Sequence, residues 1–449
     1  MLTLAQALRC SKTPRIAFVG GGGKTTAMFR LAQEMTPVLV TTSTHIRAWQ
    51  ASNADAHFIW GSDAPMPDME AHLGSGIILV TGKLDDEKER YLSLAPHQLE
   101  KLLQLANYHD LPLLIEADGS RQKPIKAPAD HEPAIPPFVD LVVVVTGLSG
   151  IGKPITDDGV HRPQIFADLS GLAVGDIITP QAVASVLVHP AGGLKNIPPT
   201  ARRVCMLNQA NSPISQAQAN EIGQILLPSF DTVLVTVLNE PKGFLPGPII
   251  AVKENIAGVI LAAGASSRYG KPKQLLDYYG LPFVRVVAET ALKAGLAQVI
   301  VVSGAHAEVI SSAVQDLPVT VAHNPDWQDG QSSSIKAGIS RLSKETGGAI
   351  ILFADQPQVS VELLRALLER HSQDLPAVLT PYVFDRRATP SLFDRVTFSD
   401  LLNLQGDVGG RAIFSKFSPR YVNWYDRRLL LDVDTPEDYK TLMTGEQIQ

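Results

Sequence analysis

Three observations predict an α/β fold in two domains. Apolar runs of strand length alternate with amphipathic helical stretches along most of the 449-residue chain. A glycine-rich loop follows an apolar strand twice, at Gly20 and again at Gly264. Between the two series lies a stretch rich in Pro and Gly, Leu238 to Asn255, that has no helical periodicity. We therefore expect a P-loop-like domain with a parallel sheet over residues 1–250 and a Rossmann-like domain over residues 256–449.

The first half is predicted to build a mostly parallel sheet. Its apolar runs are continuous rather than alternating, which indicates strands covered on both faces. Helical periodicity is expected at the amino end of the chain and over Lys24–Met35. The predicted strands are Arg15–Val19, Pro37–Thr42, Gly76–Gly82, Leu111–Asp118, Asp140–Gly147, Arg202–Leu207 and Asp231–Leu238.

The second half repeats the plan without a convincing sequence repeat. Helices are expected over Pro282–Ala294, Ser332–Leu342 and Val361–His371. The predicted strands are Ala257–Gly264, Ala297–Gly304, Val319–Asn324, Gly348–Asp355, Ala377–Tyr382, Tyr421–Tyr425 and Leu429–Asp434.

Composition excludes several classes of protein. The formal net charge is −6 with acidic and basic residues interspersed, which disfavours a nucleic-acid partner. No apolar run approaches the roughly 20 residues of a membrane helix. The two cysteines, Cys10 and Cys205, indicate neither a disulfide framework nor a thiolate metal site. We expect a cytoplasmic protein that acts on small molecules.

The first glycine loop, "GGGGKTT", has the spacing of a phosphate-binding loop between a strand and a helix. The full Walker spacing fails because Phe18 stands where its first glycine would be. A shorter G-x-x-G-K-T-T loop fits, with Lys24 directed at phosphates and Thr25 at Mg²⁺. The predicted nucleotide-binding residues are Gly20, Gly23, Lys24, Thr25 and Thr26.

Charged residues follow the predicted strand Leu111–Asp118. Glu116 and Asp118 stand at its end, where a Walker-B-like carboxylate would lie. Three cations come next, Arg121, Lys123 and Lys126, and they could contact a phosphorylated ligand or form a solvated loop. Three scattered histidines, His45, His131 and His161, have no metal-ligand spacing.

The second glycine loop, "LAAGASSRYGKPKQLL", begins where a predicted strand ends, at the edge where open α/β sheets bind ligands. Its small residues let backbone amides approach a polyphosphate, and Arg268 and Lys273 add positive charge. The loop lacks the Walker spacing. The predicted nucleotide-binding residues are Leu261, Ala262, Ala263, Gly264, Ser266 and Gly270.

This loop resembles the LAAG-x-S-x-R-M-G-x-x-K signature of MobA-like nucleotidyltransferases, and among them the molybdenum cofactor cytidylyltransferases most. The further matching stretches are Asn324–Gly338, Phe353–Pro357, Thr389–Phe414 and Leu431–Tyr439, in the order of the family. Tyr269 replaces the usual Met and Ala354 the usual Gly of the family. Ala388 and Thr389 replace a usual Gly and its polar partner, which puts the contacts to the pterin in doubt.

The resemblance implies transfer of CMP from CTP to the phosphate of the molybdenum cofactor, molybdopterin, with release of pyrophosphate. It implies that Arg268, Lys273 and Asp355 are catalytic and that Asp355 binds Mg²⁺. Asp434 could supply a second carboxylate to that ion, or it could cap the helix that follows. The substrate residues expected are Asn324, Asp407 and Arg411.

The first half resembles the YqeC family, described as accessory proteins of selenium-dependent molybdenum hydroxylases. The matching stretches are "GGGGKTT", Val40–Ile46, Ile115–Pro136, Val145–Pro154 and Val160–Phe166. The resemblance implies an accessory role, which we interpret as nucleotide binding or hydrolysis that assists cofactor assembly or delivery to a molybdenum hydroxylase client.

Two other functions remain open from the sequence. The same loop and fold also serve sugar-phosphate or polyol-phosphate nucleotidyltransferases. A cofactor carrier or chaperone would hold nucleotide and pterin without turnover, although Asp355 and Lys273 argue against it because binding alone needs neither.

Overall fold

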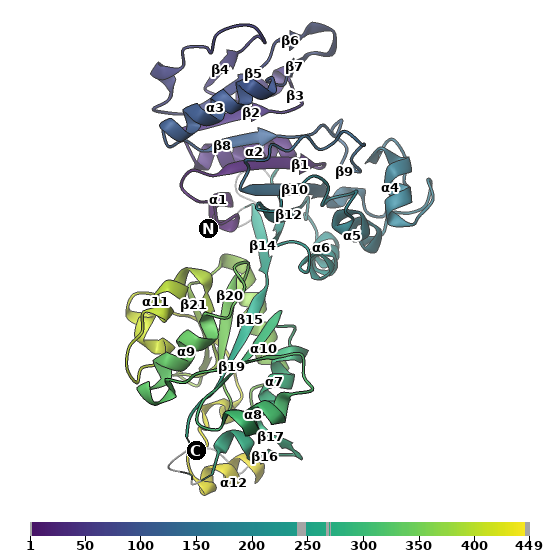
Figure 1. Ribbon diagram of the computed structural model, residues 1–449. Coiled ribbons are helices and arrows are strands. Elements are labelled where there is room, and N and C mark those ends of the chain that lie inside the picture. Colours follow the sequence, from purple (N-terminus) through teal and green to yellow (C-terminus); the bar gives the residue numbers. More distant parts are fainter. Residues whose placement is uncertain (1, 240–247, 266–268, 270, 445–449) are drawn as a thin grey trace. The chain divides into compact units, whose positions relative to one another are not determined.

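The computed structural model describes residues 2–239, 248–265, 269 and 271–444 (Figure 1). It divides into two compact units, Met1–Lys253 and Glu254–Gln449. Each unit is an α/β structure built on its own sheet, which confirms the predicted fold class. In the part of the chain that the structure describes, no helix is both long and apolar enough to cross a membrane.

The first unit is built on a sheet in which, over the described residues, nine strands follow the order β14-β13-β12-β10-β1-β8-β2-β5-β4. Neighbouring strands from β13 to β4 are parallel. Apart from the edge strand β4, their interiors are buried, as the continuous apolar runs predicted. The strands are β1 (Arg15–Gly20), β2 (Val38–Thr42), β4 (Ala56–Ile59), β5 (Ile77–Thr81), β8 (Leu113–Glu116), β10 (Leu141–Gly147), β12 (Arg202–Asn208), β13 (Thr232–Thr236) and β14 (Ile249–Glu254).

Helices cover this sheet, and two small ribbons lie at its carboxyl edge. The helices are α1 (Leu4–Ala7), α2 (Lys24–Glu34), α3 (Pro96–Tyr108), α4 (Pro163–Ser170), α5 (Pro180–Val188) and α6 (Pro213–Leu226). One ribbon is antiparallel and consists of β3 (His45–Arg47), β7 (Arg90–Leu92) and β6 (Leu84–Asp85). The other pairs β9 (Ile125–Lys126) with β11 (Val160–His161).

The second unit has a mixed sheet. Over the described residues its order is β19-β18-β15-β20-β23-β21-β22, and β24 also pairs with β21. The strands β19, β18, β15 and β20 are parallel, whereas β23 runs against β20 and β21. The strands are β15 (Ile256–Ala262), β18 (Gln298–Ser303), β19 (Thr320–His323), β20 (Gly348–Phe353), β21 (Val378–Val383), β22 (Arg386–Arg387), β23 (Ser391–Asp394) and β24 (Arg420–Asn423), with a hairpin of β16 (Asp277–Tyr278) and β17 (Leu281–Pro282).

The two faces of this second sheet carry separate cores. On one face Ile260 packs with residues of α7, α8 and α10, and on the other Val259 packs with residues of α9 and α11 (Figure 1). The alternation follows from the two-residue period of a strand. The helices are α7 (Phe283–Lys293), α8 (Ala307–Val314), α9 (Gln331–Ile339), α10 (Val361–Asp374), α11 (Phe398–Leu402) and α12 (Pro436–Thr444).

The structure differs from the prediction at Leu238–Asn255 and Leu429–Asp434, and the strands β4, β22 and β23 were not predicted. The strand β14 lies within the stretch Leu238–Asn255 that was expected to be a linker. The predicted strand Leu429–Asp434 is instead the end of a 3₁₀ helix, Arg427–Leu430, followed by irregular chain. The backbone carbonyls of Arg428 and Leu431 accept hydrogen bonds from the Gln358 side chain, in place of the hydrogen bonds that a neighbouring strand would donate.

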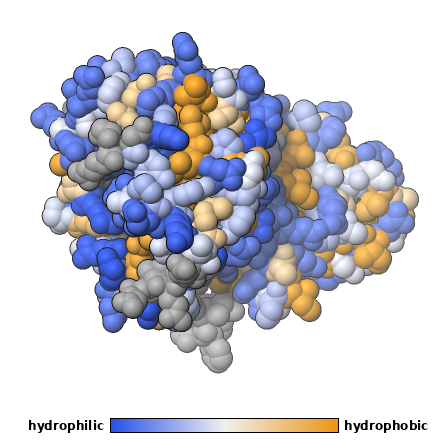
Figure 2. All heavy atoms as spheres, turned by 90° about the horizontal axis from the view of Figure 1, so that it is seen from below, coloured by the Kyte–Doolittle hydropathy of each residue, from blue (hydrophilic) through white to orange (hydrophobic). Residues whose placement is uncertain are grey.

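The surface agrees with the mixed composition. On the face seen in Figure 2, hydrophilic residues predominate and apolar residues lie between them in small groups. Scattered exposed apolar side chains of this kind are normal for soluble domains and need no partner.

Candidate functional site

The second glycine loop leaves the sheet as predicted. Leu261 and Ala262 are the last residues of β15 and are buried, and Ala263 is also buried, whereas Gly264 is exposed. The buried side chain of Gln274 fixes the loop, because its Nε2 donates a hydrogen bond to the backbone carbonyl of Gly264 at 2.8 Å. Ser266, Arg268 and Gly270 lie outside the described residues.

Three charged residues that are distant in sequence meet beside this loop. Lys273 lies in a 3₁₀ helix, Lys273–Leu275, while Asp355 follows β20 and Asp434 precedes α12. The Lys273 Nζ lies 3.0 Å from Asp355 Oδ2 and 2.8 Å from Asp434 Oδ1. Burial alone would lower the pKa of Lys273, but the hydrogen bond to Asp434 and the charge of Asp355 outweigh burial and raise it. The lysine therefore stays charged at neutral pH.

This cluster fits a divalent cation. The two carboxylates both lie within 3.0 Å of the Lys273 Nζ, and a few carboxylates together with phosphate oxygens are the donors that Mg²⁺ prefers. Among the described residues, no group of three or more His, Cys, Asp or Glu side chains could hold a metal by itself. A metal at Asp355 and Asp434 would therefore depend on ligand oxygens to complete its coordination.

The helix-cap alternative for Asp434 is answered by its neighbours. The amide of Asp438 donates to Thr435 Oγ1 at 3.2 Å, and Asp438 Oδ2 accepts from the amide of Thr435 at 2.8 Å. Thr435 and Asp438 thus form the reciprocal cap of α12. The carboxylate of Asp434 is left to face Lys273.

Two of the three predicted substrate residues, Asn324 and Asp407, contact the start of α9. Asn324 is buried and donates to the hydroxyls of Ser333 and Ser334 at 2.8 and 3.0 Å. Asp407 Oδ1 accepts from the amide of Gln331, the first residue of α9, at 3.1 Å. Arg411 is exposed in the 3₁₀ helix Gly410–Ser415.

Sequence reasoning missed a buried glutamine beside Asp355. Gln356 Nε2 donates to Asp432 Oδ1 at 2.9 Å, and its Oε1 accepts from Thr389 Oγ1 at 2.7 Å. It ties the segment of Asp355 to the segment of Asp434 and to Thr389, where the chain departs from the MobA-like pattern. Gln356 lies within the matching stretch Phe353–Pro357, but the sequence does not show that it contacts Asp432 and Thr389.

The first glycine loop is a tight turn whose amides are used internally. Gly20, Gly22 and Gly23 have φ of +99°, +71° and +123°, which only glycine adopts readily. The amides of Gly21 and Gly22 donate to the backbone carbonyls of Val145 and Lys123. The amide of Gly20 donates to Asp118 Oδ2 at 2.9 Å. In the described structure no side chain caps the amino end of α2. A ligand anion is therefore offered the first turn of α2 rather than the amides of Gly20, Gly21 and Gly22.

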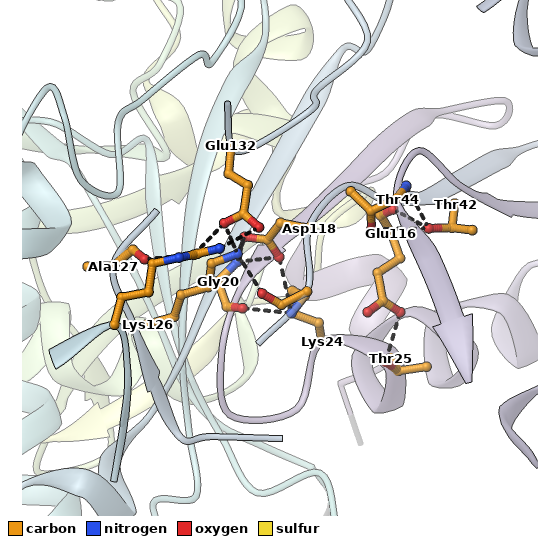
Figure 3. A network of polar contacts seen from close by, with 12 residues as sticks. Gly20, Lys24, Thr25, Thr42, Thr44, Glu116, Asp118, Lys126, Ala127 and Glu132 are labelled. Carbon is orange, nitrogen blue, oxygen red and sulfur yellow. Dashed lines mark hydrogen bonds and ion pairs between the residues drawn. The ribbon is translucent and has the colours of Figure 1, made fainter. Parts of the chain in front are cut away.

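A chain of buried ion pairs runs from this loop across the carboxyl edge of the sheet (Figure 3). Lys24 Nζ lies 3.1 Å from Asp118 Oδ1 and donates to the carbonyl of Gly20 at 2.6 Å. Lys126 Nζ bridges Asp118 Oδ2 and Glu132 Oε2 at 2.7 and 2.8 Å. Arg162 completes the chain with two hydrogen bonds to Glu132, at 2.6 and 3.0 Å.

These contacts shift the ionisation of the buried groups. Burial would raise the pKa of Glu132, but hydrogen bonds from Arg162 and Lys126 outweigh burial and lower it to about 2. Burial lowers the pKa of Lys126, opposed by Asp118. Paired charges of this kind fix the geometry of the site, since removing one partner leaves another charge buried and unpaired.

The two predicted carboxylates of the first unit have different partners. Glu116 Oε2 accepts from Thr25 Oγ1 at 2.8 Å, whereas Asp118 pairs with Lys24 and Lys126. Burial raises the pKa of Glu116, although Lys24 and Thr25 oppose it. A loop threonine beside a strand-end carboxylate is the donor pair that holds Mg²⁺ in P-loop NTPases. Glu116 and Thr25 fit such an ion, while Asp118 orients the two lysines.

A pocket of about 780 Å³ opens at the amino end of α2. Most of the residues predicted from the first loop line this one cavity: Gly23, Lys24, Thr25, Thr26 and Glu116. Gly20 and Asp118 instead line a separate, smaller cavity. The sequence did not single out Glu132 and Arg162 as site residues, although both stand in stretches quoted for the YqeC resemblance. Only the fold brings them together.

The fold and the two sites define a two-part α/β protein, with a glycine loop between a strand and a helix in its first unit and a unit of the nucleotide-transferring type after it. The YqeC protein family model matches residues 16–164, and the MobA-like NTP transferase domain model matches residues 258–421. The chain belongs to the YqeC family through its first half and carries a MobA-like NTP transferase domain in its second half, so it is a nucleotidyltransferase. The resemblances to the YqeC family and to the MobA-like NTP transferases are confirmed.

Curated relatives match one half each. The uncharacterized protein YqeC of Escherichia coli (strain K12) is 32% identical over 210 residues, 45% of this chain and 80% of the relative. The nicotine blue oxidoreductase of Paenarthrobacter nicotinovorans is 33% identical over 202 residues, 42% of this chain and 93% of the relative. A probable molybdenum cofactor guanylyltransferase of Bacillus cereus (strain ATCC 10987 / NRS 248) is 33% identical over 193 residues, 41% of this chain and 93% of the relative.

Proposed function

We propose that the second unit transfers CMP from CTP to the phosphate of molybdopterin. An oxygen of the acceptor phosphate attacks the α-phosphorus of CTP, a new P–O bond forms, and pyrophosphate leaves with the electrons of the broken bond. The observation that carries the proposal is the convergence of Lys273, Asp355 and Asp434 beside the glycine loop.

Each residue of the cluster has a role in this proposal. Asp355 and Asp434 would hold Mg²⁺, which when bound neutralises phosphate charge. Lys273, which is charged at neutral pH, would then be released from the carboxylates to meet a phosphate of the nucleotide. Gln274 keeps the loop backbone in place, and Gln356 keeps the two carboxylate segments together.

The choice of nucleotide and acceptor can be tested by offering competing substrates to the second unit. The LAAG loop with its "KQLL" continuation favours CTP, whereas the probable guanylyltransferase relative makes GTP the first competitor. A relative that matches the same half is named an oxidoreductase, so a second unit that releases no pyrophosphate with any nucleotide is a further outcome. For the first unit we propose binding of a Mg²⁺–nucleotide at Lys24, Thr25 and Glu116, in support of cofactor assembly or delivery to a molybdenum hydroxylase.

The test is pyrophosphate release by the full chain with Mg²⁺ and molybdopterin, with CTP, GTP and ATP supplied in turn. Asp355→Ala should reduce the rate about 100-fold or more, because a metal-held charge interaction is worth several kcal/mol. Glu369→Ala, which removes an exposed carboxylate from α10, is the matched control and should leave the rate unchanged. Full activity in Asp355→Ala would refute its role, and release with GTP alone would refute the cytidylyl assignment.

A further inference from the structure

The pocket of the first unit has two arms with different chemistry on either side of α2. The strand order places β10 and β12 on one side of β1, and β8 and β2 on the other. The pocket residues that follow β12 and β13 are Gln209 and Asn239, both uncharged amides. Those that follow β2, β5 and β8 include four cations and His45, and we call them the cationic arm. A nucleotide held at Lys24 and Thr25 would thus lie between an amide arm and a cationic arm.

The cationic arm carries more charge than the nucleotide site alone requires. The whole pocket is lined by two carboxylates, Glu116 and Glu132, and six cations: Lys24, Arg47, Lys88, Arg90, Arg121 and Arg162. Glu132 is already neutralised by Lys126 and Arg162. Five of the six cations remain when Lys24 is assigned to the nucleotide. Four of them, Arg47, Lys88, Arg90 and Arg121, belong to the cationic arm, and Arg162 follows β11 and pairs with Glu132.

Three of these cations are oriented by the protein, and two are not. Arg162 is fixed on Glu132, while Lys88 and Arg90 lie 3.6 and 3.5 Å from Asp85. The Nε atom of Arg90 is nevertheless buried without a hydrogen-bond partner in the described part of the chain. Because this atom is inaccessible and faces Asp85, Arg90 adds positive charge to the arm and does not offer its Nε to a ligand.

The remaining two arginines are exposed and free to meet a ligand. Arg47 is the last residue of β3, the short strand after β2, and Arg121 lies in the loop after β8. Within the residues described, neither side chain has an ion-pair or hydrogen-bond partner, and both line the pocket. Arginine with an unpaired guanidinium at the mouth of a cavity is suited to bind phosphate through two parallel hydrogen bonds.

An aromatic side chain completes this arm. Trp49 follows Arg47 by two residues, lines the pocket and is 60% exposed. An indole held open beside arginines offers a face on which a flat ring can stack. We propose that the cationic arm is a second binding site, for a phosphate ester that carries a flat ring, and that it is filled together with the nucleotide at α2.

The inference rests on the proposed function in two ways: in the choice of probe, because molybdopterin is a phosphate ester with a flat ring, and in the equivalent expected to bind to the second unit. The experiment is equilibrium dialysis of the full chain with molybdopterin, Mg²⁺ and a non-hydrolysable ATP analogue at saturation. The wild-type chain should bind two equivalents, one in each unit. The double variant Arg47→Gln/Arg121→Gln should bind one of them at least about tenfold more weakly, since each lost charged hydrogen bond costs about that factor.

The matched control is Lys12→Gln/Lys101→Gln, which removes two exposed cations of the same unit and should keep both equivalents. Pyrophosphate release by the second unit should be the same in all three proteins. Two equivalents with unchanged affinity in the arginine variant would overturn the inference. If the proposed function fails and the second unit binds no molybdopterin, a single equivalent that the arginine variant weakens would still support it.

A second measurement does not depend on counting equivalents. The indole of Trp49 should change its fluorescence when molybdopterin binds, and Trp49→Phe should remove that change while dialysis still shows binding, because phenylalanine keeps a ring for stacking. A change of the same size in wild-type and Trp49→Phe proteins would show that the ligand does not reach this arm.

Discussion

The substitution Glu132→Gln tests whether the buried ion-pair chain stabilises the first unit. The side chain keeps its size but loses the charge that Lys126 and Arg162 face. The pKa of Glu132 falls from 4.5 to about 2 in the folded protein, which at about 1.4 kcal/mol per pKa unit corresponds to about 3 kcal/mol of stability. Breaking a buried pair by removing one partner costs a similar amount.

The pH dependence follows from the direction of the shift. A carboxyl whose folded pKa is lowered contributes its full stability above its unfolded pKa of about 4.5. That contribution is lost as the pH falls from about 4.5 towards about 2. Wild-type and Glu132→Gln proteins should therefore differ by about 3 kcal/mol at pH 7 and converge at acid pH.

The assay is urea unfolding of the full chain, followed by the fluorescence of the buried Trp60 in the first unit. A loss of about 3 kcal/mol lowers the urea midpoint of this unit by about 1 M when the slope is about 3 kcal/mol per molar. Glu100→Gln, an exposed carboxylate on α3, is the matched control and should leave the midpoint unchanged. An unchanged midpoint in Glu132→Gln, or a difference that persists undiminished near pH 3, would refute the reasoning.

Three further outcomes are expected. Gly23→Ala should abolish binding of an ATP analogue to the first unit in a calorimetric titration, because a Cβ would lie 2.6 Å from Asn208 Nδ2 and φ is +123°; retained affinity would contradict the assigned loop. Gln274→Ala should slow pyrophosphate release about tenfold or more, because the loop carbonyl of Gly264 loses its donor; an unchanged rate would show that the loop is held otherwise. Burial and the charge of Arg162 lower the pKa of His161 to about 4, so His161→Asn should leave the pH dependence of molybdopterin binding between pH 6 and 8 unchanged in dialysis; a new dependence would show a charged imidazole there.

Much of the fold was predictable because its signal is local. Strands covered on both faces are continuous apolar runs, and β1, β8 and β10 stand where those runs predicted them. Strands with partly exposed residues, such as β4 and β14, have no such run and were missed. The leucines of Leu429–Asp434 resemble a strand in sequence, but the carbonyl of Leu431 accepts its hydrogen bond from the Gln358 side chain and not from a neighbouring strand.

The sites were predictable only as parts. Lys273, Asp355 and Asp434 were each singled out, yet that one amine lies between both carboxylates depends on a contact across 161 residues. Glu116 and Asp118 were indistinguishable in sequence, and only the fold assigns one to Thr25 and the other to Lys24. Glu132 and Arg162 carry no motif of their own, because a buried ion pair is defined by its partner and not by spacing.

The most direct test of the central claim is to identify the product of the full chain by mass after incubation with Mg²⁺, molybdopterin and an equimolar mixture of CTP and GTP. The account predicts a molybdopterin cytosine dinucleotide and one equivalent of pyrophosphate, both lost in Asp355→Ala. A guanine dinucleotide as the sole product, or molybdopterin recovered unchanged from folded protein, would contradict it.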